Sequence, residues 1–285
     1  MIKIVTDAAV RFTTPNFAQK HGVTIAPISA RCGNICIPDG PDADLHNLRP
    51  SLNECEQEIH IESPSVNQIA DIYAQLSTQT NYILSLHSSS GLTDSFRNAQ
   101  KASQQFLGRM DIHVVDSQTT SIGLGLVVQT CVQGMQRGES LDKLVKTVRG
   151  MITRLYTVMF LDDLSYLARK QIVSQSQAIL GNMLGVIPFL TIENGDLQPM
   201  EKVRSRPRAL EKLIEFVCEF SGVDHLGILH GYGKPTQDAL YIAERLRSLY
   251  PSSPITQVCY GPTLAPFIGF NGLGAIVLES KEESI

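Results

Sequence analysis

Residues 83–102 read ILSLHSSSGLTDSFRNAQKA, and this stretch decides the fold of the chain. A short apolar run predicts a strand over residues 82–86, and a serine-rich polar turn follows over residues 87–93. Apolar residues on one side of the next segment then predict a helix. Free backbone N–H groups and the positive end of a helix dipole favour an anion at such a turn. Thr93 is a suitable N-cap, because its hydroxyl can accept a backbone N–H bond.

The turn alone leaves two interpretations open, a capped strand–helix turn without a ligand and a ligand site. Similar strand patterns at residues 2–6 and 113–115 alternate with helical patterns. This alternation predicts a mostly parallel sheet, in which ligands lie beyond the carboxyl ends of the strands. We expect four turns to gather at that edge, at Asp7, Ser63, residues 89–93 and Asp116.

The pattern changes near residue 155, where hairpin and crossover signals occur together. Asn194-Gly195 is typical of a tight hairpin turn. The sequence therefore predicts an α/β protein with two α/β domains. Residues 1–155 are expected to form a mostly parallel three-layer sheet, and residues 156–285 a mixed sheet with helices on one face, with a ligand between them. A short helix is predicted over residues 45–59.

Composition excludes several classes of protein. The 285 residues are 43% hydrophobic and carry a formal net charge of −4, which offers no electrostatic footprint for nucleic acid. No apolar run is long enough for an integral membrane segment, and the N-terminus reads as a strand. The six cysteines form no zinc pattern, and we expect all six to be reduced in a cytoplasmic protein.

The residues give little support to either of two kinds of enzyme site, a serine hydrolase site and a phosphate-binding site. His87, Ser88 to Ser90 and Asp116 supply the residue types of a serine hydrolase, but no G-x-S-x-G elbow surrounds the serines. No glycine-rich phosphate loop occurs between a strand and a helix, and no convincing set of magnesium-binding carboxylates is present. Gly123 and Gly125 lie in a helical pattern and indicate a close approach to another element. Arg204 near a strand end is interpreted either as a solvated edge residue or as facing an anion.

The chain resembles the DegV family over nearly its whole length. The motifs that carry the resemblance occur in the family's order: Ile4-Val5-Thr6-Asp7, Ser63-Pro64-Ser65, residues 87–99, Val115-Asp116-Ser117, Gly123-Leu124-Gly125, Leu164-Ser165-Tyr166-Leu167, residues 180–184, Lys202-Val203-Arg204 and the glycine-rich residues 269–274. Each motif is weak alone, but the ordered set is specific.

The resemblance implies a long-chain fatty acid buried between two α/β domains. It implies the role of fatty-acid-binding subunit of a bacterial fatty acid kinase, which presents the carboxylate to a separate kinase subunit for acyl phosphate formation in phospholipid synthesis. Such a carrier has no catalytic residues, no metal and no cofactor of its own. The ligand-binding residues that it implies here are Ser63, Ser89, Thr93, Asp94, Ser95, Arg204 and Phe267.

The chain also departs from the family's motifs. Ile61 and Glu62 stand where the family has the first threonine and serine of its Thr-Ser-Gln-Pro-Ser turn, and Asp94 replaces a glycine. Ile172 replaces a basic residue, with Lys170 and Arg169 nearby, and Phe267 replaces a late histidine. Thr93 keeps the hydroxyl of the turn serine that contacts the carboxylate. We therefore expect lipid binding to persist and the kinase step to be weak. The alternative is an enzyme that acts on a small phosphorylated or acyl substrate in the same cleft.

Overall fold

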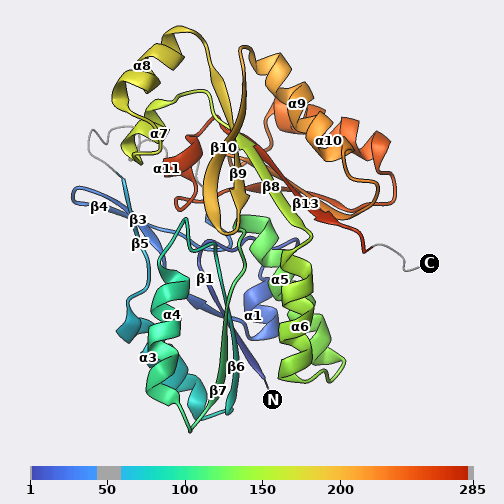
Figure 1. The fold of residues 1–285 in the computed structure, drawn as a ribbon. Coiled ribbons are helices and arrows are strands. Elements are labelled where there is room, and N and C mark those ends of the chain that lie inside the picture. Colours follow the sequence, from blue (N-terminus) through green and yellow to red (C-terminus); the bar gives the residue numbers. More distant parts are fainter. Residues whose placement is uncertain (1, 44–58, 282–285) are drawn as a thin grey trace.

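The computed structural model describes residues 2–43 and 59–281. The chain folds around two large sheets, one in its first half and one in its second half, as Figure 1 shows. This confirms the predicted α/β class, with one parallel and one mixed sheet. Most of the helix predicted over residues 45–59 lies outside the described residues. The boundary near residue 155 between two domains remains our proposal.

The first sheet has four parallel strands in the order β2-β1-β6-β7. Its strands are β1 (Lys3–Asp7), β2 (Thr24–Ala26), β6 (Tyr82–His87) and β7 (Asp111–Asp116). Helices α3 (Val66–Ser77) and α4 (Ser95–Ser103) lie together on one side, and α1 (Phe17–His21), α5 (Ser121–Gln136) and α6 (Leu141–Ile152) lie on the other (Figure 1). A short 3₁₀ helix, Gln104–Phe106, follows α4. Because both faces are covered, β1 and β6 are buried along most of their length, and this includes the polar side chains of Thr6, Ser85 and His87.

A small antiparallel sheet, β4-β3-β5, lies beside the first one (Figure 1). Its strands are β3 (Ser29–Cys32), β4 (Ile35–Pro38) and β5 (His60–Glu62). Cys32 is disulfide-bonded, so the expectation that all six cysteines are reduced is wrong. Cys36, Cys131 and Cys218 are free thiols. The cytoplasmic location, which rested on reduced cysteines, remains a prediction.

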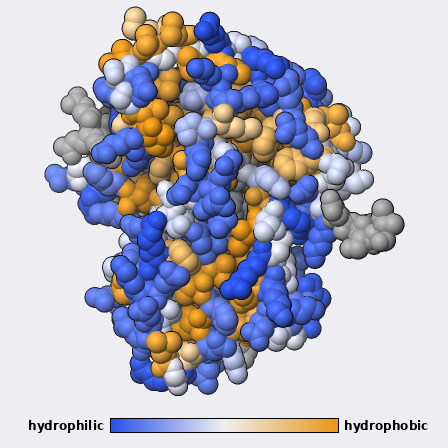
Figure 2. Space-filling model, in the orientation of Figure 1, coloured by the Kyte–Doolittle hydropathy of each residue, from blue (hydrophilic) through white to orange (hydrophobic). Residues whose placement is uncertain are grey.

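The second sheet has six strands in the mixed order β10-β9-β8-β13-β11-β12. They are β8 (Leu155–Phe160), β9 (Ile187–Glu193), β10 (Asp196–Val203), β11 (Val223–His230), β12 (Ile255–Cys259) and β13 (Leu273–Glu279). Helices α9 (Arg206–Cys218) and α10 (Gln237–Leu249) pack on one face through a shared apolar core. Three short helices complete this half: α7 (Ser165–Arg169), α8 (Gln175–Met183) and α11 (Ala265–Ile268). Exposed apolar side chains gather on and just after α8, at the top of Figure 2.

The other face of this sheet packs on α5, so a single apolar cluster runs through both halves of the molecule. Gly227 on β11 lies directly against the side chain of Ile122 on α5. Gly125 lies so close to the backbone after β1 that a Cβ there would overlap the carbonyl oxygen of Arg11. The close approach predicted for Gly125 is therefore confirmed, and a side chain at this position would separate α5 from that backbone.

A buried ion pair joins three segments that are far apart in the sequence. Arg11 follows β1, and its guanidinium lies 2.8 Å from the Asp39 carboxylate, with both side chains at most 4% exposed. The Arg11 Nε also donates to the carbonyl oxygen of Cys259 at 3.0 Å. Asp39 in turn accepts from the backbone N–H and the hydroxyl of Thr263. The pair therefore joins the small sheet to the second half of the chain.

The β9–β10 hairpin reaches from the second sheet to the turn that follows β6. Asn194 and Gly195 both have positive φ, at 51° and 89°, which confirms the tight turn predicted from this dipeptide. The carbonyl oxygen of Gly195 accepts the N–H of Gly91 at 2.9 Å and the hydroxyl of Ser89. The second half of the chain is thus anchored directly on the serine-rich turn.

Candidate functional site

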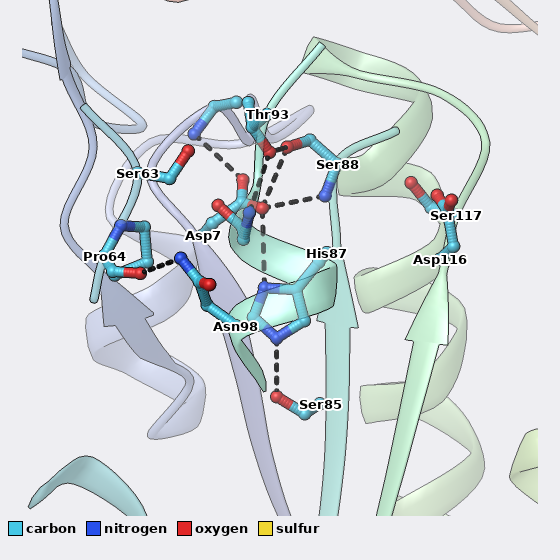
Figure 3. Close-up of polar contacts among 12 residues, drawn as sticks. Asp7, Ser63, Pro64, Ser85, His87, Ser88, Thr93, Asn98, Asp116 and Ser117 are labelled. Carbon is cyan, nitrogen blue, oxygen red and sulfur yellow. Dashed lines mark hydrogen bonds and ion pairs between the residues drawn. The ribbon is translucent and has the colours of Figure 1, made fainter. Parts of the chain in front are cut away.

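Four turns meet at the carboxyl edge of the parallel sheet, as the sequence predicts (Figure 3). Asp7, at the end of β1, bonds to Ser88 in the turn after β6. Ser63 bonds to that turn from the segment before α3, and Asp116 bonds to it from the end of β7. This convergence follows from the parallel order, because neighbouring parallel strands end at the same edge.

Asp7 is the central acceptor of this edge, and its side chain is fully buried. One oxygen, Oδ2, accepts the backbone N–H of Ser88 at 2.8 Å and its hydroxyl at 2.9 Å. The other oxygen accepts the N–H of Ala9 at 3.2 Å. Three donors therefore converge on this one carboxylate.

A second chain of buried side chains approaches Asp7 from below (Figure 3). The Tyr73 hydroxyl donates to Ser85 Oγ at 2.8 Å, and Ser85 Oγ lies 2.8 Å from His87 Nε2. His87 Nδ1 lies 3.5 Å from Asp7 Oδ2, within ion-pair range but without a hydrogen bond of good geometry. Burial raises the pKa of Tyr73 far above its usual value, so the phenol remains a donor.

The contacts among Ser85, His87 and Asp7 have the residue types of a hydrolase triad, but their surroundings do not suit one. Ser85 and His87 are both fully buried, and the Ser85 oxygen already accepts from Tyr73. His87 faces Asp7, whereas Asp116 accepts from the backbone of Ser90 and Gln118. The serine-hydrolase arrangement weighed from the sequence, with Ser88 to Ser90 and Asp116, is therefore not formed.

Thr93 lies inside this network, at 5% exposure. Its hydroxyl oxygen lies 3.0 Å from Ser88 Oγ and accepts the N–H of Ser95 at 3.3 Å. The prediction that Thr93 is the N-cap of the helix is wrong by one residue, since α4 begins at Ser95 and its N-cap is Asp94. Asp94 makes no side-chain cap and pairs instead with Arg97 at 2.9 Å. Thr93 still bonds to the first helical N–H, as expected.

Ser63 and Asp94 lie at the rim of the network. The Ser63 hydroxyl accepts the Asp94 N–H at 2.9 Å. Next to it, Asn98 on α4 donates to the carbonyl oxygen of Pro64 at 2.9 Å and so ties the two turns together (Figure 3). Ser63 also lines a pocket of about 570 Å³ beside the small sheet, with Pro27, Ile28, Ser29, Cys36, Pro38, Glu62 and Gln68.

Two predicted binding serines have contrasting surroundings. Ser89 is buried, and its N–H donates to Thr119 while its hydroxyl donates to the hairpin tip, so its donors are already used. Ser95 is also fully buried, but its hydroxyl has no hydrogen-bond partner among the described residues. A buried hydroxyl without a partner is costly, which makes Ser95 Oγ a group available to a ligand.

The structure does not bring Arg204 to Thr93. Arg204 is exposed and follows β10, whose other end lies at the hairpin tip beside Ser89. Eight extended residues at roughly 3.3 Å each place Arg204 about 25 Å from that tip. One carboxylate at Thr93 therefore cannot also bind Arg204.

Phe267 on α11 and the apolar residues Ile61 and Ile172, which replace polar residues of the family, share one apolar cluster. Phe267 is a buried member of the cluster that runs through both halves, and Ile61 and Ile172 pack against the same cluster. Lys170 Nζ lies 5.5 Å from the centre of the Phe267 ring and donates to the carbonyl oxygen of Ile59. Of the two cations near Ile172, Lys170 therefore lies beside Phe267, whereas Arg169 lies over the Tyr166 ring.

Sequence reasoning placed Asp7 at this edge but did not include it, Ser88, Ser85 or Tyr73 among the site residues. The position of Asp7 at a strand end was the available signal, whereas its pairing with Ser88 depends on the register between β1 and β6. Within residues 2–43 and 59–281, no group of three histidine, cysteine or carboxylate side chains is arranged to hold a metal ion. In the same residues no helix has the length and apolarity to cross a membrane.

The family model described as "Uncharacterised protein, DegV family" matches residues 1–280. A DegV domain-containing protein of Streptomyces coelicolor is 25% identical over 279 residues, covering 97% of this chain and 98% of that protein. The structure of a fatty acid binding DegV family protein from Streptococcus agalactiae matches with a TM-score of 0.86 at 20% identity, over 99% of both chains.

A second solved structure has the same fold. It is a DegV family protein from Eubacterium eligens loaded with heptadecanoic acid, which matches with a TM-score of 0.82 at 18% identity, over 99% of this chain and 100% of that one. The TM-scores of the two structures establish the shared fold, and the family model spans nearly every residue. The chain therefore belongs to the DegV family.

Proposed function

We propose that this protein binds a long-chain fatty acid between its two halves, with the carboxylate at Thr93. The observation that carries the proposal is a buried hydroxyl at the end of a strand–turn–helix unit, next to an apolar cluster common to both sheets. Leu92, adjacent to Thr93, and Phe267 belong to that cluster. The hydroxyl of Ser95 is a second buried polar group nearby, and it has no hydrogen-bond partner in the described part of the chain.

Two of the matched proteins support this ligand class. The Streptococcus agalactiae protein is named as fatty acid binding, and the Eubacterium eligens protein was loaded with heptadecanoic acid. Burial of a sixteen-carbon tail at about 0.8 kcal/mol per CH₂ contributes roughly 10 kcal/mol before entropic costs. A hydrogen bond to the carboxylate adds about 1.5–3 kcal/mol. The tail therefore dominates affinity, and an altered head site still permits binding.

We further propose that the protein is a carrier rather than an enzyme, and that it presents its bound fatty acid to a fatty acid kinase subunit. In that role Ser63, Ser95 and Thr93 surround the head group, with Asp94 at the rim and Ser89 holding the turn. Arg204, about 25 Å from the hairpin tip if β10 is fully extended, would meet the partner or the phosphorylated product at another surface. Phe267 would line the acyl chain.

Replacement of Thr93 by valine is expected to weaken palmitate binding by about tenfold to 100-fold, because one charge-assisted hydrogen bond to the carboxylate is lost. The shape of the side chain is nearly unchanged, so the tail contacts remain. Fluorescence displacement or calorimetry on delipidated protein measures the change. Thr78→Val, at the exposed end of α3, is the matched control and should leave affinity unchanged. An affinity within about twofold of wild type for Thr93→Val would contradict the head-group assignment.

A further inference from the structure

The chain of hydroxyls between Asp7 and Thr93 has a fixed direction in the unliganded protein. Asp7 Oδ2 lies 2.9 Å from Ser88 Oγ, and Ser88 Oγ lies 3.0 Å from Thr93 Oγ. An ionised carboxylate can only accept, so the single proton of Ser88 points to Asp7. The proton of Thr93 must then point to Ser88, and Thr93 presents lone pairs to any ligand.

The chain on the other side of Asp7 runs in the same sense. Tyr73 donates to Ser85, which leaves the Ser85 proton for His87 Nε2. A neutral His87 then carries its proton on Nδ1, 3.5 Å from Asp7 Oδ2. The first chain therefore ends on Asp7, and the second ends at His87 Nδ1, which lies within ion-pair range of Asp7 Oδ2.

A carboxylate bound at Thr93 places a second anion at the far end of the first chain. Two hydroxyls, Ser88 and Thr93, then separate two carboxylates by three oxygen–oxygen contacts but hold only two protons. One contact is left without a proton, which is unfavourable for buried groups. A single additional proton completes all three contacts.

We propose that binding of a long-chain carboxylate at Thr93 is coupled to the uptake of one proton by the Asp7–His87 pair. The proton comes from solvent and no covalent bond changes. On Asp7, it turns the carboxyl into a donor to Ser88, so that Ser88 donates to Thr93 and Thr93 to the ligand. On His87, it fills Nε2, which faces Ser85 Oγ, and makes the ring a cation whose Nδ1–H lies 3.5 Å from Asp7 Oδ2. This charge compensates Asp7 for the proton of the Ser88 hydroxyl, which is then free to turn towards Thr93.

The titratable groups next to these hydrogen bonds leave Asp7 and His87 as the pair that holds the additional proton. Tyr73 on α3 stays a neutral donor, since burial raises its pKa. Asp116 on β7 accepts from two backbone N–H groups, and Asp94 pairs with Arg97 on α4. Among the contacts of the described residues, no lysine or arginine side chain bonds to Asp7, Ser88 or Thr93.

This inference rests on the proposed fatty acid ligand and can be tested separately from it. The probes are dodecanoate and dodecan-1-ol, which share a tail, while the alcohol brings its own proton and no charge. Calorimetry between pH 7 and pH 8.5, in buffers of different ionisation enthalpy, counts the protons bound with each ligand. We expect about one proton with dodecanoate and none with dodecan-1-ol, so that dodecanoate affinity falls by about tenfold per pH unit.

Two serine variants in the same turn locate the coupling. Ser88→Ala breaks the chain and frees the Thr93 hydroxyl, so dodecanoate should still bind but with proton uptake close to zero. The Ser90 hydroxyl is not part of the chain of hydroxyls between Asp7 and Thr93, so Ser90→Ala should keep the proton uptake of the wild type. Dodecanoate binding without proton uptake in the wild type, or with undiminished uptake in Ser88→Ala, overturns the inference alone. Absence of any dodecanoate binding overturns the inference together with the proposed function.

Discussion

Replacement of Asp39 by alanine is expected to lower the free energy of unfolding by about 3–5 kcal/mol. The change leaves the Arg11 guanidinium buried at 4% exposure without its carboxylate, and it also removes the acceptor of the Thr263 hydroxyl and N–H. An uncompensated buried charge is far more costly than a missing surface pair. Urea denaturation with constant slope measures the difference.

The control for this prediction is an ion pair of the same type on the surface. Arg208 and Glu215 on α9 lie 2.7 Å apart and are about half exposed, so Glu215→Ala should leave the denaturation midpoint nearly unchanged. If Asp39→Ala behaved like Glu215→Ala, the Arg11–Asp39 pair would not join the segments it contacts. A double variant, Arg11→Met with Asp39→Leu, should recover much of the lost stability, because the buried charge is removed.

The second large effect concerns phosphorylation of the bound fatty acid. With ATP and a fatty acid kinase subunit, we expect acyl phosphate formation about 100-fold slower than with a family member that has the polar residues, because oxyanion-stabilising groups are worth about that much. Ile61, Ile172 and Phe267 all pack against the apolar cluster and offer no hydrogen bond or charge. Lys170, beside the Phe267 ring, would sustain the residual rate.

The test is reconstitution with palmitate-loaded protein and detection of acyl phosphate. The paired substitution Phe267→His with Ile61→Thr should raise the rate, whereas Lys170→Met should lower what remains. The rates are compared at saturating palmitate, and palmitate affinity is measured in parallel for each variant, which separates transfer from binding. A wild-type rate equal to that of a fully polar family member would contradict the prediction.

The parts of the fold that the sequence predicts are those set by local patterns. Apolar runs ending in polar turns identify β1 and β6, and Asn194-Gly195 identifies the hairpin because only a few residues adopt positive φ easily. Gly125 inside a helix likewise indicates a close backbone contact, because glycine has no side chain to keep another segment away. These signals act over a few residues and need no knowledge of the whole chain.

The network around Asp7 depends on pairings that no local pattern contains. Ser88 reaches Asp7 because Thr6 pairs with Leu86 across two parallel strands, and this register is set by packing of the whole sheet. Asp39 meets Thr263 across 224 positions of sequence. The N-cap of α4 is Asp94, one residue after the predicted Thr93, and its carboxylate pairs with Arg97 instead of capping the helix. The distance of Arg204 from Thr93 likewise follows from the direction of β10.

Mass spectrometry of the ligand released from purified protein tests the proposed function most directly. Denaturing extraction of freshly purified protein should release long-chain fatty acid, and delipidated protein should bind added palmitate or oleate. The same extraction from Thr93→Val should release less fatty acid, because its head group is held more weakly. Repeated extraction without lipid, with no binding of palmitate or oleate, would contradict the account. Release of a small phosphorylated or acyl compound instead would favour an enzyme acting on that compound in the same cleft.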